Sequence, residues 1–319
     1  MPRATLTTNQ FLDHRLWDTL PADRPIALQQ HWAYGETLKA IGADVSQTIF
    51  EIEGKAVAFA LLGHRSFYRA LDVTSLMRGP LWVTPPTEAQ QQTVFRSLKK
   101  AFNPWKWKFL AFQPDLPDTP TAQKTLKAES FRQIMTGHST VWIDLSADEE
   151  ALRANLQGKW RNQLVKAEKA NLTISFGGRK AHQYSWLLEQ EKAQQETRGY
   201  SAIPTGFVSL YADIAQRFAP ANQTLGVLSV SCLQERAKVA GAIFLLHGNS
   251  ATYHLGWSGD AGRAVNAQNK VLWSGMLALK ERGIRFLDLG GINTVDGAGI
   301  ARFKLGLGAS PTTYAGTWV

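Results

Sequence analysis

The chain has 319 residues, of which 44% are hydrophobic and 19% are charged, so its composition is that of a globular protein and excludes a disordered or fibrous one. Its length is long for one hydrophobic core and sufficient for two domains. Lys and Arg outnumber Asp and Glu by 35 to 26, and the net charge of +9 favours a polyanionic partner (nucleic acid, nucleotide phosphates or an anionic membrane surface) or simply a basic surface without a dedicated ligand.

A single cysteine, Cys232, excludes an internal disulfide and a thiolate metal cluster. It alternates with serines in the period-two pattern of a strand with one buried face, so we expect a core thiol rather than a nucleophile. Residues 1–25 lack the pattern of a signal peptide, and the longest apolar run, Val239 to Leu246, is far shorter than the ~20 residues of a membrane-spanning helix. We therefore expect a cytoplasmic monomer that can still touch the inner face of a membrane.

A helix followed by a β-hairpin is predicted twice along the chain. The predicted helices are 29–41 and 207–218, and the predicted strand pairs are 48–52 with 56–62 and 226–232 with 239–246. This weak internal repeat indicates a duplicated α/β unit. A loop-rich stretch, 114–120, lies between the halves and is followed by a short predicted helix at 122–129. We place the boundary near Gly137, which gives domains 1–137 and 138–319.

The second half opens with a predicted strand at 139–145 and a predicted helix. Ser146 and Glu149 have the spacing of a capping box at the start of this helix. One apolar stripe follows at helical spacing, made of Leu152, Leu156, Trp160 and Leu164. Another face of the helix is basic and is either a solvated surface or a phosphate contact; it carries Lys159, Asn162, Lys166 and Lys169.

The last part of the chain is predicted to run from a helix into strands. The helix covers 270–282, and Gly283 suits the left-handed cap position behind it. A short strand at 284–289 is followed by Gly290 and Gly291, and a loop at 293–299 leads into a further predicted strand at 300–308. The final predicted strand is 312–319.

Several sequence signatures of catalysis are absent. The chain has no HExxH zinc motif, no GxxxxGK[ST] phosphate loop and no GxSxG nucleophile elbow. Chemistry without a metal, a redox group or an evident nucleophile indicates direct transfer between two bound substrates. In such a reaction the protein supplies orientation and charge stabilisation.

Four segments together carry a family resemblance. The segments 285–292 and 302–308, the basic stretch 159–169 and the tripeptide Arg78-Gly79-Pro80 resemble, in this order from the C-terminus, parts of the Fem family of peptidoglycan aminoacyl transferases. The resemblance implies an α/β fold of two tandem GNAT-like (N-acetyltransferase-fold) domains, with mixed, mostly antiparallel sheets flanked by helices. It further implies transfer of an amino acid from aminoacyl-tRNA to an amine on the stem peptide of a cell-wall precursor, lipid-linked or nucleotide-linked, with no cofactor beyond that co-substrate. The segment between Ala181 and Phe218 is too short for the helical arm of the best-known members, which favours the compact branch.

The same resemblance suggests roles for individual residues. Lys304 is our candidate to stabilise the oxyanion of the tetrahedral transition state. Arg302, two residues earlier on the same predicted strand face, is a candidate to bind phosphate, and Phe303 between them a candidate to contact substrate. Arg198, with Tyr200 beside it, is the candidate clamp for an anionic acceptor.

Other candidates remain open between function and fold. Arg161 and Lys166 on the basic helix either contact tRNA phosphates or serve the fold, and a pair of aromatic residues, Tyr253 and Trp257, either lines the substrate groove or packs in the core. The general base is Asp288 or His254, if either is more than structural.

Two further readings compete with aminoacyl transfer. An acyl-CoA-dependent N-acyltransferase on the same fold would use acetyl-CoA, but the segment 259–264 does not fit the glycine-rich turn that usually cradles the CoA pyrophosphate. A non-enzymatic RNA-binding protein would use the positive charge and the abundant aromatic residues, although no RNA-binding motif is present.

Overall fold

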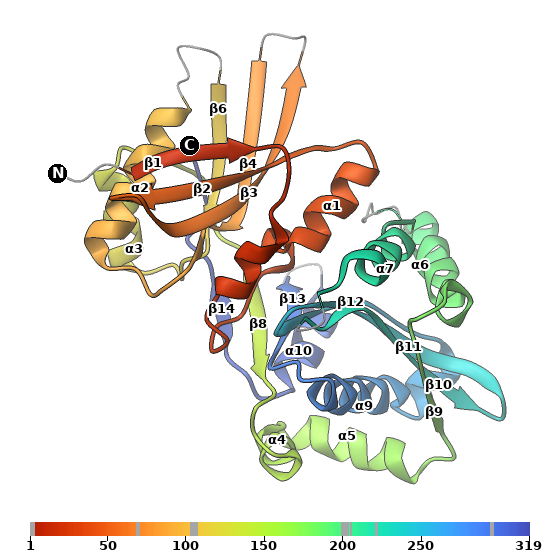
Figure 1. The fold of residues 1–319 in the computed structure, drawn as a ribbon. Helices are drawn as coiled ribbons and strands as arrows, with labels where there is room; N and C mark the ends of the chain where they lie inside the picture. Colours follow the sequence, from red (N-terminus) through yellow and green to blue (C-terminus); the bar gives the residue numbers. More distant parts are fainter. Residues whose placement is uncertain are drawn as a thin grey trace. The chain divides into compact units, whose positions relative to one another are not determined.

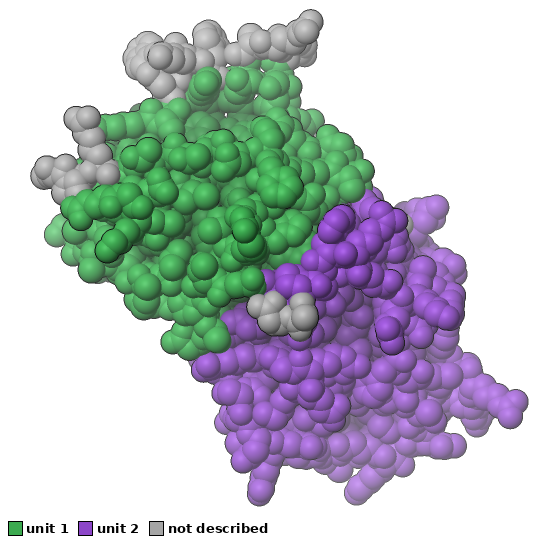
Figure 2. All heavy atoms as spheres, in the orientation of Figure 1, with its two compact units in different colours: residues 1–139, 312–319 green, residues 140–311 purple. Residues whose placement is uncertain are grey.

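The protein is described by a computed structural model that covers residues 4–67, 71–102, 108–198, 204, 206–220, 223–293 and 297–319. Two compact units divide the chain, and Figure 2 shows them in green and purple. Unit 1 contains Met1–Ser139 together with Thr312–Val319, and unit 2 contains Thr140–Pro311. The predicted domains, 1–137 and 138–319, differ from this division in two ways: the boundary lies two residues later, and the C-terminal segment belongs to the first unit.

Unit 1 is a mixed sheet with helices packed on it. Its strands follow the order β1-β2-β3-β4-β6-β15-β7, with β5 paired to β3. The strands are β1 Ala4–Asn9, β2 Asp44–Ile52, β3 Lys55–Phe67, β4 Leu71–Gly79, β5 Leu81–Trp82, β6 Lys108–Pro114, β7 Gln133–Met135 and β15 Thr317–Trp318. The helices are α1 Trp32–Ala40, α2 Glu88–Ala101 and α3 Pro120–Ala128, with 3-10 turns at His14–Thr19 and Leu28–Gln30 (Figure 1).

The strand alternation of unit 1 sends side chains to two faces. Phe50 and Leu62 join the core that α2 and α3 cover. On the opposite face α1 lies against β2, and its Gly35 comes so near that a Cβ there would lie 3.0 Å from a methyl group of Leu61. A side chain at this position would therefore push the helix away from the sheet.

Unit 2 is built on the second sheet, whose strand order is β14-β8-β13-β12-β11-β10-β9. The strands are β8 Ser139–Asp144, β9 Thr173–Gly177, β10 Leu225–Gln234, β11 Ala237–His247, β12 Ser250–Ser258, β13 Phe286–Ile292 and β14 Pro311–Thr313. The helices are α4 Glu149–Asn155, α5 Gly158–Lys169, α6 Ser185–Arg198, α7 Gly206–Phe218, α8 Asp260–Ala264, α9 Ala267–Glu281 and α10 Ala298–Leu305, with a 3-10 turn at Ala181–Gln183.

Helices also cover both faces of the second sheet (Figure 1). On one face α5 and α9 bury Trp160, Leu164 and Met276 against the strands. On the other face α7 packs against β10, and the Tyr211 hydroxyl donates a hydrogen bond of 2.8 Å to the Leu246 carbonyl.

The predicted helix–hairpin repeat is confirmed. Each hairpin turn places two residues in the left-handed region, Glu53 and Gly54 between β2 and β3, and Glu235 and Arg236 between β10 and β11. Such turns match the right-handed twist of the paired strands. Cys232 is fully buried in β10, and burial raises the pKa of its thiol to about 11, so the cysteine is a core residue as expected.

The predicted helix after strand β8 is two helices rather than one. Asp148 is the N-cap of α4, since its side chain accepts a hydrogen bond of 2.7 Å from Ala151 N. Ser146 does not cap it; its N–H is instead bonded to the Asp144 carboxylate at 2.8 Å. The apolar stripe continues across the break between α4 and α5 because both helices face the same core.

The segment 300–308, predicted as a strand, is mostly helical. It forms α10, which ends with Gly306 as its C-cap. A helix places residues three apart on one side, so Ala301 and Lys304 are both buried while Arg302 is exposed. The final predicted strand, 312–319, is also wrong as one element, because β14 and β15 lie in different sheets.

The described helices are short. The longest of them, α9, has 15 residues. A helix that crosses a bilayer needs about 20 apolar residues. None of the described helices is long and apolar enough to cross a membrane.

Two substitutions test which residue caps the N-terminus of α4. Asp148→Ala should lower the free energy of unfolding by about 1 kcal/mol, because it removes the acceptor for Ala151 N. Ser146→Ala should change the stability much less. Urea unfolding of both variants measures the difference, and equal losses would restore the predicted capping box.

Candidate active site

The two strands at the centre of unit 2 separate part of the way along. β12 and β13 are paired in parallel only from Ser250 with Phe286 to Thr252 with Asp288, although both strands continue further. In unit 1 the corresponding pair, β4 and β6, is paired from Asp72 with Lys108 to Gly79 with Pro114, with one register irregularity between Met77 and Gly79. Unit 2 therefore has an opening in its hydrogen-bonding pattern that unit 1 lacks.

A bulge marks the same place on the other side of β12. The register between β11 and β12 shifts so that Ile243 faces Leu255 and Phe244 faces Tyr253, which leaves His254 as the extra residue. A bulge bends its strand and increases the local twist. It therefore helps β12 to turn away from β13.

Lys304 lies where the strands separate. Its Nζ donates a hydrogen bond of 2.8 Å to the Gly291 carbonyl. Gly290, with φ of +71°, is so close that a Cβ there would lie 3.8 Å from Lys304 Nζ and 4.0 Å from the Tyr253 carbonyl oxygen. Helix α10 and both separating strands thus meet at this ammonium group.

Asp288 organises the turn that receives Lys304. Its carboxylate is buried and accepts hydrogen bonds from Thr140 Oγ1 at 2.5 Å and from Gly290 N at 2.8 Å, both on Oδ1. The bond to Gly290 N closes a small turn that presents the next carbonyl, Gly291, to Lys304. Asp288 is therefore a positioning group, and its engagement with two donors makes it a poor candidate for the general base.

The charge of Lys304 depends on two opposing effects. Burial lowers the pKa of its ammonium, because the charged form loses hydration. The negative charge of Asp288 acts in the other direction and raises that pKa. A buried, partly dehydrated ammonium next to a strand end has the properties of an oxyanion-stabilising donor.

The neighbours of Lys304 in the sequence face elsewhere. Arg302 is exposed, because a step of two residues turns roughly 200° around a helix axis. The expectation that it shares a face with Lys304 is therefore wrong. Phe303 is half-buried, and its ring centroid lies 5.8 Å from that of Trp160. It packs against the α5 side of the core.

Tyr253 is held by a glutamine that the sequence analysis did not single out. Its hydroxyl accepts a hydrogen bond of 3.0 Å from Gln268 Nε2, an atom that also lies 3.3 Å from the Gly241 carbonyl. Burial raises the pKa of Tyr253 to about 12, so the phenol stays protonated. Gln268 is the second residue of α9, where no motif marks it.

Trp257 packs against a second tryptophan. The rings of Trp257 and Trp186 meet edge to face with centroids 5.8 Å apart, and Trp186 also lies on Gly241, where a Cβ would come within 2.9 Å of its ring. Lys238 Nζ stands 5.0 Å from the Trp186 ring centroid. The indole N–H of Trp186 and the side-chain oxygen of Gln268 are buried without a hydrogen-bond partner. One hydrogen-bond donor and one acceptor are therefore unsatisfied next to Tyr253 and Trp257.

His254 is a weak base in this structure. Burial lowers the pKa of its imidazole to about 4, despite the opposing charge of Glu191. Its ring lies 6.3 Å from that of Phe207. Within the described residues no group of three His, Cys, Asp or Glu side chains is arranged to hold a metal.

On the basic face of α5, one side chain supports the fold and the lysines are exposed. Arg161 donates hydrogen bonds to the carbonyls of Ala154 and Leu156, at 3.2 and 2.9 Å, and so closes the end of α4. Lys159, Lys166 and Lys169 are exposed. Arg198 is the last residue of α6, but its side chain and all of Tyr200 lie outside the described residues.

The segment 259–264, which does not fit the glycine-rich turn of CoA-binding proteins, is mostly helical. Residues 260–264 form α8, with the acidic Asp260 in its first turn. Arg263 bonds Asp260 at 2.6 Å and the Ser258 carbonyl at 2.6 Å. The buried Gly262 lies so near the Val239 carbonyl that a Cβ would come within 2.3 Å of it. This packing differs from an open glycine turn whose amides point at an anion.

The link between Asp288 and Lys304 can be measured directly. Asp288→Asn removes the negative charge that opposes the effect of burial, so the pKa of Lys304 should fall further below that of an ordinary lysine. NMR titration of the lysine side chains, assigned with Lys304→Met, reports this pKa without an activity assay. Asp144→Asn, at an exposed aspartate of β8, is the matched control and should leave the pKa unchanged. If the pKa of Lys304 were unchanged in Asp288→Asn, the role assigned to Asp288 would be contradicted.

Comparisons with known proteins concern the domain type and the fold. Residues 153–305 match the family model of the acetyltransferase (GNAT) domain. The structure of FemX is similar at a TM-score of 0.76 and 14% identity, with 98% of this chain and 96% of that chain covered. No curated protein matches the chain.

Two further solved structures are similar. One is a tandem GNAT protein from the clavulanic acid biosynthesis pathway, with a TM-score of 0.57, 11% identity and 99% and 98% of the two chains covered. The other is the C-terminal domain of a putative lysylphosphatidylglycerol synthetase from Agrobacterium fabrum, with a TM-score of 0.51, 16% identity and 82% and 80% covered. The chain therefore has the predicted fold of two tandem GNAT-like units, and its residues 153–305 match the model of a GNAT-type acetyltransferase domain.

Proposed function

We propose that the protein transfers an amino acid from aminoacyl-tRNA to an amine on the stem peptide of a peptidoglycan precursor. The observation that carries the proposal is the buried Lys304 ammonium at the point where β12 and β13 separate. The FemX-like fold and the GNAT domain match support an acyl transfer at this point. A protein named for making an aminoacylated lipid also has a similar fold, which is compatible with a cell-envelope acceptor.

The reaction needs one charged hydrogen-bond donor at the carbonyl oxygen. The acceptor amine attacks the ester carbonyl carbon, a C–N bond forms, and negative charge gathers on the oxygen. The ester C–O bond then breaks, and the tRNA hydroxyl leaves with the proton that the amine gives up. A lysine ammonium has three N–H donors, and since one of them is directed to Gly291 O, others can bind the oxyanion.

The donor substrate accounts for the exposed basic face of α5. Lys159, Lys166 and Lys169 are exposed on one helix, and phosphate groups of a nucleic acid bind such lysines in a salt-dependent way. Arg161 has a smaller part in this proposal, because it already closes the end of α4. Charged tRNA is a cytoplasmic substrate, so the proposal places the reaction in the cytoplasm, with aminoacyl-tRNA as co-substrate and no other cofactor.

Acetyl-CoA is the second candidate donor, favoured by the match of residues 153–305 to the GNAT acetyltransferase domain. The packing of α8 weighs against it, since Gly262 lies against the Val239 carbonyl and the segment lacks an open glycine turn for the CoA pyrophosphate. Lys304 would stabilise the oxyanion of a thioester in the same way. The two donors thus share a site and differ in what binds outside it.

Lys304→Met should lower the transfer rate by about 10²–10³-fold, the usual effect of losing one oxyanion donor. Transfer of labelled amino acid from a charged tRNA pool to a muropeptide precursor measures this, in parallel with labelled acetyl-CoA. Lys270→Met is the matched control, because Lys270 Nζ also donates to a carbonyl, that of Leu172 at 2.9 Å, elsewhere in unit 2.

Each outcome of this experiment separates the donors. Transfer from tRNA that is lost in Lys304→Met and kept in Lys270→Met supports the proposal. Transfer from acetyl-CoA alone would mean that acetyl-CoA, and not aminoacyl-tRNA, is the acyl donor at the same site. Equal transfer by Lys304→Met and the unsubstituted protein would reject the role of Lys304, and no transfer from either donor would reject aminoacyl transfer to a cell-wall acceptor.

The rate should also fall with alkaline pH. Lys304 acts in its protonated form, and burial lowers its pKa, so activity is present below that pKa and is lost as the pH rises through it. The alkaline limb should therefore lie below the value of about 10.4 for an ordinary lysine. A pH–rate profile under single-turnover conditions measures it, and an alkaline limb at or above that ordinary value would contradict a buried catalytic ammonium.

A further inference from the structure

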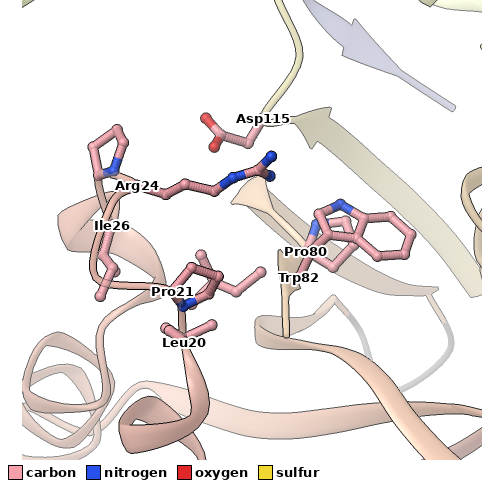
Figure 3. A pocket seen from close by; sticks show the side chains of 9 residues that line it. Leu20, Pro21, Arg24, Ile26, Pro80, Trp82 and Asp115 are labelled. Atoms are coloured by element: carbon pink, nitrogen blue, oxygen red, sulfur yellow. The ribbon is translucent and has the colours of Figure 1, made fainter. Parts of the chain in front are cut away.

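Unit 1 contains a small pocket of mixed character. Its volume is about 130 Å³, and its walls include the apolar side chains of Leu20, Pro21 and Pro80 with the indole of Trp82. Two residues of opposite charge, Arg24 and Asp115, line it as well. Figure 3 shows the Arg24 side chain extending toward the Asp115 carboxylate, with Trp82 on the other side of the guanidinium.

The pocket lies beyond the ends of two parallel strands. Pro80 follows β4 directly, and Asp115 follows β6 directly, while Asp115 N donates a hydrogen bond of 3.3 Å to the Gly79 carbonyl. In open α/β sheets, ligands bind outside the carboxyl ends of the strands. These two strands occupy in unit 1 the place that β12 and β13 occupy in unit 2.

The backbone at the end of β4 is held in a strained conformation. Arg78 has φ of 54°, in the left-handed region that non-glycine residues rarely adopt. Its buried guanidinium donates a hydrogen bond of 2.6 Å to the Tyr314 hydroxyl and lies 4.8 Å from the centre of that ring. Gly79 leaves no room for a side chain, since a Cβ would lie 2.8 Å from Gln30 Cδ. Strain of this kind persists where the surroundings fix it, commonly at ligand sites.

We propose that this pocket binds a small zwitterionic amino-acid group. Arg24 would bind the carboxylate with its planar guanidinium, and Asp115 would accept hydrogen bonds from the ammonium. An apolar cavity of about 150 Å³ holds a benzene-sized molecule, so this pocket suits a group the size of alanine. Leu20, Pro21 and Pro80 would contact a short aliphatic side chain.

The charges on the pocket explain the preference for a zwitterion. A lone anion would leave the Asp115 carboxylate facing it, and a lone cation would leave Arg24 facing it, so each meets repulsion as well as attraction. A group with both charges replaces the attraction between Arg24 and Asp115 by two attractions of its own. It can come from a free amino acid or from a peptide side chain that carries an amino and a carboxylate group on one carbon.

Binding is measured by NMR titration of the ¹⁵N-labelled protein, with the Trp82 indole signal assigned through Trp82→Phe. The probes are alanine, a diaminopimelate-containing tripeptide, N-acetylalanine and alanine amide. Alanine or the tripeptide should bind saturably, and the two blocked alanines should bind about tenfold or more weakly, because each lacks one charge. Arg24→Gln and Asp115→Asn should each weaken binding about tenfold or more. Arg15→Gln is the matched control, since Arg15 pairs with Asp13 at 2.9 Å elsewhere in unit 1.

The outcomes decide the inference without an acyl donor. Binding of alanine points to a free amino acid as the natural source, and binding of the tripeptide alone points to a peptide. Equal binding of alanine and N-acetylalanine, unchanged affinity in Arg24→Gln and Asp115→Asn, or no binding of any probe would overturn the proposal. Because Lys304 has no part in this measurement, a protein that binds alanine but transfers nothing would reject the proposed function and keep the pocket.

Discussion

The second unit depends on the end of one ladder of hydrogen bonds, between β12 and β13 at Thr252 and Asp288. Backbone N–H and C=O groups beyond a ladder need other partners. The Asp288 carboxylate takes the N–H of Gly290, and the Lys304 ammonium takes the carbonyl of Gly291. Two side chains of opposite charge thus satisfy the backbone that the neighbouring strand leaves open. An ammonium group is held in the sheet as a consequence, and this group has donors to spare for a substrate.

The two units use the same helix–hairpin design in different ways. In unit 1 the ladder between β4 and β6 continues to Gly79 and Pro114, with an irregularity between Met77 and Gly79, so these strands stay paired further than β12 and β13. Polar groups gather beyond the strand ends instead, where Arg24 and Asp115 line a pocket. The candidate active site therefore lies within the sheet of one unit, and the proposed binding pocket lies beyond the strand ends of the other.

The candidate site residues differ in how far the sequence points to them. Lys304 was found through its resemblance to a family segment, although the predicted strand around it is a helix. The difference matters because the helix buries Lys304 and turns Arg302 to the surface. Gln268 and Thr140 were not predicted, because a single polar residue in a helix or strand forms no recognisable sequence pattern. Their contacts with Tyr253 and Asp288 exist only after distant segments meet.

The sequence by itself determined the hairpins, most of the helices and the core thiol Cys232, because alternation, helical spacing and turn residues act over a few neighbouring positions. Only the tertiary structure decided that α4 and α5 are separate, that 298–305 is helical and that the C-terminal residues return to unit 1. These features depend on contacts such as that of Trp318 with Phe112 across the sheet, which join residues far apart in the chain. Local sequence patterns do not predict such pairings, because these depend on burial and on the register of distant strands.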